Sequence, residues 1–290
     1  LYSVAVLMDK TQNIGYFSTV TGVKHDAYGA INNAGKVIAP FKYDEVTLAD
    51  EKDEYHPENN YCFVIIKLEG KYGAVDTLGR VICQPVYSEL AALTPQLIKI
   101  KQNGLWGWAD GRTGRVLQSP KYENVSKSYA LEGALEVEQN GKTGLAAADG
   151  RIIVKPLYTS FRYLGYQNSG ILGYTAANGK SGIMDTSGRE ITPPIYGDLE
   201  QGPAPGIIAA AENGKTGIIA ADGRVMVPLR YSSATPLGNV MKICLDNKCG
   251  LVNAAGKEIV PPLYDNIRGI NVKGQEIYGA AVPDAWGRMQ

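Results

Sequence analysis

The chain contains 290 residues, of which 44% are hydrophobic and 20% are charged, so it can form a packed core and is not a disordered tail. Lysine plus arginine and aspartate plus glutamate each total 29, which excludes an overall field that would attract nucleic acid or an anionic membrane. No apolar run approaches the roughly 20 residues that span a bilayer. Because the sequence begins at Leu1 rather than at methionine, we expect a processed N-terminus and a signal peptide that has been removed.

One pattern recurs along the chain: a glycine, a short apolar stretch, a second glycine with a basic residue after it, and then proline and tyrosine. Residues 71–87 read KYGAVDTLGRVICQPVY, and residues 248–264 read KCGLVNAAGKEIVPPLY. The first glycines are Gly29, Gly73, Gly107, Gly144, Gly182, Gly217 and Gly250. The motif units lie near residues 24–46, 71–90, 105–125, 142–161, 180–199, 215–234 and 248–267, which predicts seven repeats.

Three further columns accompany these glycines. A cation follows each second glycine: Lys36, Arg80, Arg115, Arg151, Arg189, Arg224 and Lys257. The motif ends at Tyr43, Tyr87, Tyr122, Tyr158, Tyr196, Tyr231 and Tyr264. Three residues later comes Val46, Leu90, Val125, Phe161, Leu199, Ala234 or Ile267, which we expect to pack against the next unit.

The fourth unit illustrates the predicted secondary structure. Residues 134–138 alternate apolar and charged side chains, Asn140 and Gly141 are a strong hairpin signal, and residues 144–148 form the return strand. Residues 152–155 are expected to form a third strand that stops at Pro156, because proline has no amide hydrogen for pairing. Each repeat is therefore predicted to have three antiparallel strands.

A three-stranded unit cannot bury its own apolar face, so the units must stack and share cores. We predict one all-β domain over residues 1–290, with an incomplete capping unit at 269–290. A propeller-like radial array is favoured because closure removes exposed strand edges, and an open β-superhelix is the alternative.

These columns resemble the bacterial WG-repeat family, which is named for a Trp-Gly pair. Trp106 precedes Gly107 here, tyrosine precedes Gly29 and Gly73, and Thr, Ser or Cys takes the tryptophan position in the other units. The resemblance implies envelope or secreted interaction modules, some of them near toxin and secretion systems. It carries over no catalytic residue.

The cysteines are Cys62, Cys83, Cys244 and Cys249, without the spacing of a zinc site. With residues 246 and 247 as a two-residue turn, Cys244 and Cys249 lie opposite each other on two strands, which predicts a disulfide if the protein is exported. A pair of small buried side chains is the alternative. Whether Cys62 and Cys83 also pair stays open, because their strands are the first and third of one unit.

Nothing in the sequence predicts catalysis or a cofactor. The two histidines, His25 and His56, lie in separate loops without partner spacing, and no nucleophile elbow or phosphate-binding loop is present. We therefore expect a chain that is not an enzyme and has no metal or cofactor.

Two groups of charged residues are candidates for binding a partner. Arg80, Arg115, Arg151, Arg189 and Arg224 would form a ring or stripe that meets an acidic protein or a polyanion, unless they only solvate hairpin ends, and Lys71, Lys142, Lys180, Lys215 and Lys248 have the same two interpretations. An insertion at residues 44–60 carries Asp44, Glu45, Asp50, Glu51, Asp53, Glu54 and Glu58. It is interpreted either as a site for a basic partner or as a solvated loop, and it lacks the ligand spacing of a calcium loop.

The function predicted from the scaffold is binding of another protein in the envelope or secreted space, for example as an immunity or adaptor protein for a secreted toxin. One alternative is a cell-wall polysaccharide binder, with Trp106, Trp108, Trp286, Tyr163, Tyr166 and Tyr174 as aromatic candidates for stacking on sugars. A second alternative is a hydrolase that uses a central cleft. We predict no nucleic-acid partner and no membrane span.

Overall fold

The computed structural model describes residues 7–9, 14–21, 24–32, 35–49, 63–164, 170–272 and 275–281. These residues form strands and turns, with no helix among them. Consequently, nothing in the described part of the chain is a helix long and apolar enough to cross a membrane. The chain divides into two compact units, one with Leu1–Ser128 and Gly133–Ile152 and the other with Tyr129–Glu132 and Ile153–Gln290.

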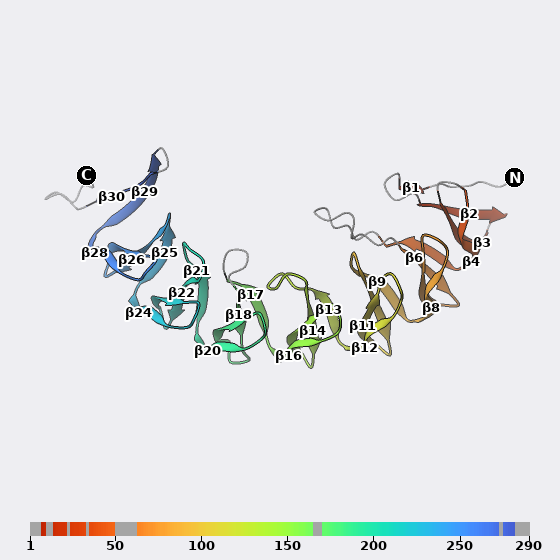
Figure 1. Ribbon diagram of the computed structural model, residues 1–290, viewed down its shortest axis with the longest axis horizontal. Coiled ribbons are helices and arrows are strands. Elements are labelled where there is room, and N and C mark those ends of the chain that lie inside the picture. The colour runs from red at the N-terminus through yellow and green to blue at the C-terminus, as the bar shows by residue number, and fades with distance from the viewer. Residues whose placement is uncertain are drawn as a thin grey trace. The chain divides into compact units, whose positions relative to one another are not determined.

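The first unit contains successive antiparallel sheets (Figure 1). Sheet 1 is β1 (Leu7–Asp9), β2 (Ile14–Thr21), β3 (Lys24–Asn32) and β4 (Val37–Tyr43), and sheet 2 is β5 (Glu45–Leu48), β6 (Phe63–Leu68), β7 (Lys71–Asp76) and β8 (Val81–Tyr87). Sheet 3 is β9 (Glu89–Thr94), β10 (Leu97–Gln102), β11 (Leu105–Asp110) and β12 (Val116–Tyr122). Sheet 4 begins with β13 (Asn124–Lys127), β14 (Ala134–Gln139) and β15 (Lys142–Ala147), and its fourth strand is β16 (Ile152–Tyr158).

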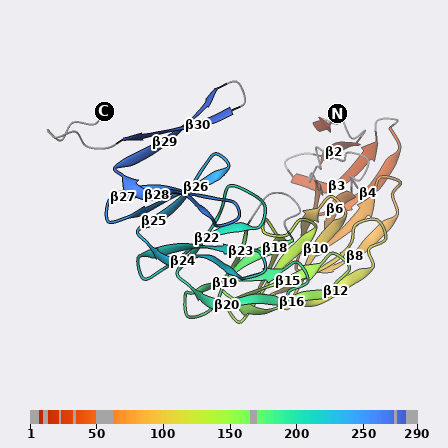
Figure 2. The same ribbon diagram turned by 60° about the vertical axis from the view of Figure 1, so that its left-hand side comes forward.

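The second unit continues the same order of strands (Figure 2). Sheet 5 is β17 (Ser160–Tyr163), β18 (Ile171–Thr175), β19 (Ser181–Asp185) and β20 (Glu190–Tyr196), and sheet 6 is β21 (Asp198–Gln201), β22 (Ile207–Glu212), β23 (Lys215–Ala220) and β24 (Val225–Tyr231). Sheet 7 is β25 (Ser233–Leu237), β26 (Val240–Leu245), β27 (Lys248–Asn253) and β28 (Glu258–Tyr264). Among the described residues, sheet 8 has β29 (Asn266–Val272) and β30 (Gln275–Ala281).

The tandem array of β repeats is confirmed, but the prediction of three strands per repeat is wrong. The segment after each motif tyrosine, which was expected to be only a packing turn, is the first strand of the next sheet. The predicted stop at Pro156 is also wrong, since β16 continues to Tyr158. Proline is tolerated there because the fourth strand is at the edge of its sheet and needs no ladder bond on its outer side. The single-domain assignment and the choice between a radial and an open array stay predictions.

The second strand turns tightly into the third because residues with positive φ occupy both turn positions. Asn140 and Gly141 have φ values of 52° and 65°, and Asp246 and Asn247 have 49° and 64°. Two consecutive left-handed residues are the signature of the two-residue hairpin turn that matches the twist of the flanking strands. Both predicted hairpins are therefore confirmed.

Glycine is required in the two columns for two different close contacts with the backbone. A Cβ on Gly107, in the third strand of sheet 3, would lie 2.3 Å from the carbonyl oxygen of Gln118, because the fourth strand bulges over this position. Gly114 has a φ of 70°, and a Cβ there would lie 1.5 Å from the carbonyl oxygen of Ile82 in sheet 2. The first glycine thus permits the bulge within a sheet, and the second permits one sheet to approach the next.

Within each unit, neighbouring sheets share hydrophobic cores, as a stacked repeat requires. Phe63 and Ala74 of sheet 2 pack with Leu90 and Ile98 of sheet 3. In the second unit, Ile218 of sheet 6 packs with Met241 and Ile243 of sheet 7. Leu90 and Ala234 belong to the column three residues after the motif tyrosine, so this column forms part of the cores between sheets.

Candidate binding surfaces

Sheets 2, 3, 5, 6 and 7 each have a row of four paired residues, one per strand, that ends at the motif tyrosine; we call it the tyrosine row. In sheet 3 the row is Glu89, Lys101, Trp106 and Tyr122. The Lys101 ammonium is 3.0 Å from the Glu89 carboxylate and 4.8 Å from the centre of the Trp106 ring. Sheet 2 repeats this arrangement with Glu45, Lys67 and Tyr72, where the corresponding distances are 3.6 Å and 4.9 Å. The tryptophan of the Trp-Gly pair is therefore the third member of a charged and aromatic row.

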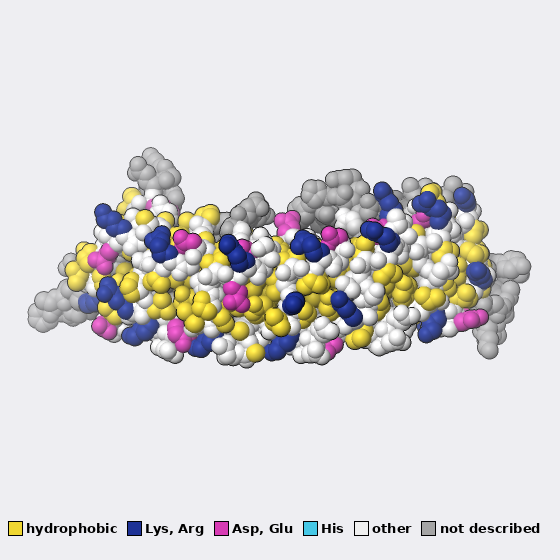
Figure 3. Space-filling model, turned by 60° about the horizontal axis from the view of Figure 1, so that its bottom comes forward, with side chains coloured by type: hydrophobic (Ala, Val, Ile, Leu, Met, Phe, Trp, Pro, Cys, Tyr) yellow, Lys and Arg dark blue, Asp and Glu magenta, His cyan; other side chains and the backbone are white. Residues whose placement is uncertain are grey.

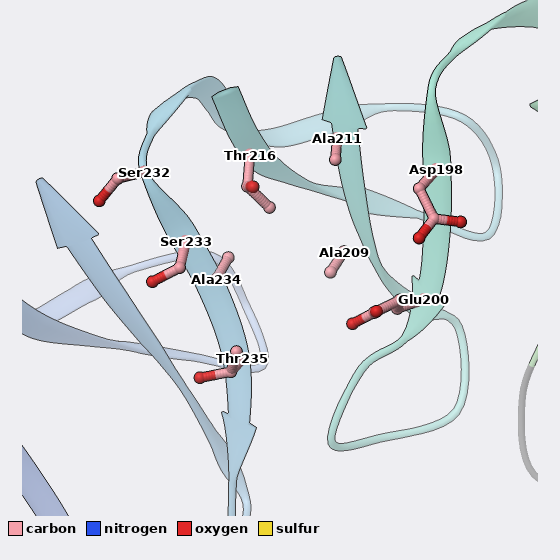
Figure 4. A pocket seen from close by; sticks show the side chains of 9 residues that line it. All are labelled: Asp198, Glu200, Ala209, Ala211, Thr216, Ser232, Ser233, Ala234 and Thr235. Atoms are coloured by element: carbon pink, nitrogen blue, oxygen red, sulfur yellow. The ribbon is translucent and has the colours of Figure 1, made fainter. Parts of the chain in front are cut away.

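The tyrosine row of sheet 6 is Asp198, Ala211, Thr216 and Tyr231. Here the carboxylate is retained while alanine and threonine replace the lysine and the aromatic residue. A pocket of about 180 Å³ lies at this position, between sheet 6 and β25 of sheet 7 (Figure 4). It is lined by Asp198, Glu200, Ala209, Ala211, Thr216, Ser232, Ser233, Ala234 and Thr235. The sequence analysis missed this site, although small residues in one repeat at positions that are long in others were a usable signal.

The turn arginines, which follow the second glycines, are all exposed, as predicted, but two of them are held by the turn itself. The Nε atom of Arg80 donates to Asp76 at 2.6 Å, and that of Arg189 donates to Asp185 at 3.0 Å. In the described part of the chain, the side chains of Arg115, Arg151 and Arg224 form no ion pair. Arg80 and Arg189 therefore stabilise their turns.

Asp185 closes its turn with several hydrogen bonds. Its carboxylate accepts the Ser187 hydroxyl at 2.6 Å and the Arg189 backbone N–H at 3.0 Å. The hydrogen bond from the Ser187 hydroxyl, followed by the bonds from Arg189, lowers the pKa of Asp185 to about 2. The carboxylate is therefore a structural acceptor of the turn.

Two of the five lysines at the hairpins between the second and third strands form ion pairs. Lys180 pairs with Glu212 of the next sheet at 2.5 Å, and Lys248 pairs with Asp265. These two side chains link neighbouring sheets rather than only solvating a turn. No ion pair of Lys71, Lys142 or Lys215 is found among the described residues.

The first residues of the predicted insertion at 44–60 belong to the repeat itself. Asp44 accepts the backbone N–H of Gly70 at 3.2 Å, and Glu45 is the first residue of β5, so both belong to the repeat. Asp50, Glu51, Asp53, Glu54 and Glu58 lie outside the described residues, as does His56. Among the described residues, no group of three or more His, Cys, Asp or Glu residues could hold a metal ion.

Cys244 and Cys249 are paired directly across β26 and β27, and their sulfur atoms are 2.11 Å apart, at disulfide distance. This geometry agrees with the predicted disulfide. Cys83 is buried, and burial raises the pKa of its thiol to about 11, which makes it unreactive. Cys62 lies outside the described residues, so the question of whether it pairs with Cys83 stays open.

Most of the described aromatic candidates for sugar stacking are core residues. Trp106, Trp108 and Tyr174 are 9%, 0% and 1% exposed, so their assignment as sugar-stacking residues is wrong. The Trp108 indole N–H donates to the Ala148 carbonyl at 2.8 Å, which fixes it inside the core of sheets 3 and 4. Tyr163 is 43% exposed, whereas Tyr166 and Trp286 lie outside the described residues.

Large apolar side chains are exposed on the fourth strand of each of the seven four-stranded sheets. Nine of the 13 large hydrophobic residues found exposed are on these strands: Val37, Val81, Val86, Val116, Leu157, Ile195, Val225, Ile259 and Leu263, each 44–63% exposed. Figure 3 shows exposed hydrophobic side chains with Lys and Arg near them. Scattered exposure of single apolar residues is ordinary, but eight of these nine recur at two positions of the motif, six residues or one residue before its tyrosine.

Comparisons with solved structures return alignments over most of the chain at low similarity. The computationally designed Ika8 protein is 12% identical, with 96% of this chain and 93% of that chain covered and a TM-score of 0.31. A eukaryotic initiation factor is 12% identical over 95% and 77% with a TM-score of 0.38, and Hsv2p of Kluyveromyces lactis is 9% identical over 99% and 97% with a TM-score of 0.28. No conclusion about function follows from alignments at this level. No curated protein matches the sequence.

A family model described as "WG containing repeat" matches residues 28–51, 72–106 and 250–277. The three segments include the first motif glycines Gly29, Gly73 and Gly250 and the motif tyrosines Tyr43, Tyr87 and Tyr264. They coincide with the repeats seen in the sheets. Together with the repeated columns of glycine and tyrosine, this match confirms the predicted resemblance to the WG-repeat family at these three segments.

Proposed function

We propose that this chain is a non-catalytic scaffold that binds another protein along the fourth strands of its sheets. The observation that supports this proposal is the recurrence of exposed valine, isoleucine and leucine side chains on these strands. Apolar contacts supply most of the free energy of protein association, and a surface on paired strands needs little reordering on contact.

The turn arginines give the proposed partner a charge preference. Arg115 and Arg224 directly precede Val116 and Val225, so an exposed guanidinium lies beside an exposed apolar side chain at the start of β12 and β24. A partner surface with apolar residues and carboxylates would complement both. Charge complementarity of this kind sets specificity and the association rate more than affinity.

We place this activity in the envelope or secreted space, with an immunity or adaptor role toward a secreted toxin as its most specific form. The cysteine pair at disulfide distance supports an oxidising compartment, where such bonds persist. Counting thiols in denatured protein purified from the native compartment tests this location. At most two free thiols are expected, and four would contradict it.

Site-specific photo-crosslinking tests the proposed surface. A photoreactive phenylalanine analogue at Leu157, Ile195 or Leu263 should yield the same adduct with one protein in native extract. The matched control is the analogue at Tyr129, which is 93% exposed but not on a fourth strand. Equal adducts at Tyr129, or none at the three strand positions, would contradict the proposal, as would turnover of an ester, glycoside or peptide substrate by the purified chain.

A further inference from the structure

The pocket of sheet 6 occupies the position where two other sheets carry a lysine. In sheets 2 and 3 the second strand supplies Lys67 or Lys101, whose ammonium lies between the carboxylate of the first strand and the aromatic ring of the third. The backbone register that creates this contact is the same in sheet 6, where Asp198 pairs with Ala211 and Ala211 pairs with Thr216. Sheet 6 therefore keeps the carboxylate of the row and lacks the cation.

The space left by the missing side chains is not filled by neighbouring residues. Ala209 and Ala211 on β22 form one wall, and β25 of sheet 7 forms the opposite wall (Figure 4). The pocket of about 180 Å³ is several times the roughly 30 Å³ that a water molecule occupies in the liquid. It can therefore admit an alkyl chain with a small polar head.

The charges that border the pocket favour a single positive group. Oδ1 of Asp198 accepts a hydrogen bond from Arg162 at 2.8 Å and from the Leu199 backbone N–H at 2.9 Å. Glu200, one residue further along β21, is exposed, and Figure 4 shows its carboxylate directed toward the pocket. Two carboxylates and one guanidinium leave one net negative charge beside the alanine wall.

We infer that this pocket binds an alkylammonium group, and that its source is a lysine side chain of the bound protein. The source of the lysine rests on the proposed function, whereas the chemistry of the pocket does not. The ammonium replaces the one that sheets 2 and 3 provide internally, with Asp198 and Glu200 as its acceptors. The alkyl chain lies against Ala209 and Ala211.

A titration of the full chain with Nα-acetyl-lysine methylamide tests the chemistry without any partner. With alanine methyl groups labelled with carbon-13, the signals of Ala209 and Ala211 should shift saturably, in the millimolar range expected for a ligand of this size. The neutral analogue Nα-acetyl-norleucine methylamide should bind at least tenfold more weakly. Raising the salt from 0.05 to 0.5 M should weaken binding of the lysine compound only, because screening acts on the charge.

Two variants locate the site. Ala211→Lys supplies the missing ammonium from within and should abolish the shift of the Ala209 methyl. Glu200→Gln, a change at an exposed residue that leaves packing intact, should weaken binding three- to tenfold. Unchanged binding in both variants, or equal binding of the norleucine compound, would overturn the pocket assignment.

The source of the ammonium is tested separately. If 1,4-diaminobutane binds tenfold more tightly than the lysine compound, the site belongs to free amines and the lysine source is wrong. If crosslinking at the fourth strands identifies a partner while the lysine compound fails to bind, the pocket inference alone falls. If the lysine compound binds while crosslinking identifies no partner, the proposed function falls and the ammonium chemistry stands.

Discussion

Sheets 3 and 6 have the same backbone arrangement but different side chains in the tyrosine row. Sheet 3 places a glutamate, a lysine and a tryptophan in contact, whereas sheet 6 places an aspartate beside alanine and threonine and leaves a pocket. In both sheets the fourth strand bulges opposite the first motif glycine, so the register is the same. The comparison teaches that the glycines and the tyrosine define the repeat, while the residues between them can vary and create local sites.

The largest effect is expected where the two sheets are alike. Gly107→Ala and Gly217→Ala would bring a Cβ within 2.3 Å and 2.5 Å of the carbonyl oxygens of Gln118 and Val227. Since backbone rather than a flexible side chain must move, each variant should lose more than about 3 kcal/mol of unfolding free energy. Urea denaturation measures this loss, with Gly279→Ala as the comparison, because a Cβ there meets nothing within 4 Å and its backbone is that of a strand. A normal midpoint in either motif variant would contradict the shared backbone.

The next largest effect on stability distinguishes the side chains of the two tyrosine rows. Trp106→Thr gives sheet 3 the residue that sheet 6 has at the same position, and it removes a ring that is only 9% exposed. We expect a loss of about 3 kcal/mol from the cavity and from the lost contacts with Lys99 and Lys101. Thr216→Ala in sheet 6 should cost less than about 1 kcal/mol. Equal losses by urea denaturation would mean that the two rows contribute equally to stability.

The tyrosine row of sheet 7 has a third set of side chains, which includes the Cys244 and Cys249 pair. The loop that this pair closes is short, so the entropic model gives a stabilisation of about 2 kcal/mol. A double Cys244→Ser and Cys249→Ser variant should lose this amount in urea denaturation without reductant. The native chain should lose it on addition of reductant, and the double variant should not respond. A midpoint that is independent of reductant in the native chain would show that the pair does not form.

A smaller effect concerns the turns between the third and fourth strands, where sheet 5 has Asp185 and sheet 6 has Ala220. The folded-state pKa of Asp185, about 2, is below its ordinary value of 3.8, so its contribution is present above about pH 4. That contribution is lost as the pH falls toward 2. Because the carboxylate is near solvent, we expect about 1 kcal/mol or less.

The Asp185→Ala variant should therefore be less stable than the native chain at pH 6 and nearly equal to it at pH 2. Thermal melts across this range measure the difference. Asp222→Ala is the control, since that carboxylate accepts only one hydrogen bond, from the backbone N–H of Arg224. A difference that grows as the pH falls would contradict the assigned sign.

Much of the fold is predictable from the sequence because its turns depend on glycine and asparagine at fixed positions. The hairpin at Asn140 and Gly141, the disulfide register of Cys244 and Cys249, and the seven motif units all follow from local patterns. The fourth strand of each sheet was not predicted to extend through its proline. The reason is that a proline at a sheet edge costs no ladder bond, and edge position depends on tertiary pairing.

The candidate surfaces were harder to predict because they depend on which face of a strand meets a neighbour. Trp108 looked available for a sugar but is enclosed between sheets 3 and 4, and Arg80 looked free but is held by Asp76. The exposure of Leu157 and Ile195 on the fourth strand was not predicted. Strand alternation gives two faces, and only the stacking of the sheets decides which one is covered.

The central claim, that sheets 2, 3, 5, 6 and 7 share one row geometry with exchangeable side chains, is tested most directly in sheet 6. Ala211→Lys should restore the ion pair with Asp198, whereas Ala211→Met adds a similar length of chain without charge. We predict that the lysine variant is more stable than the methionine variant by about 0.5 kcal/mol in low salt, and that this advantage disappears in 1 M salt. A methionine variant that is equally or more stable in low salt would contradict the claim.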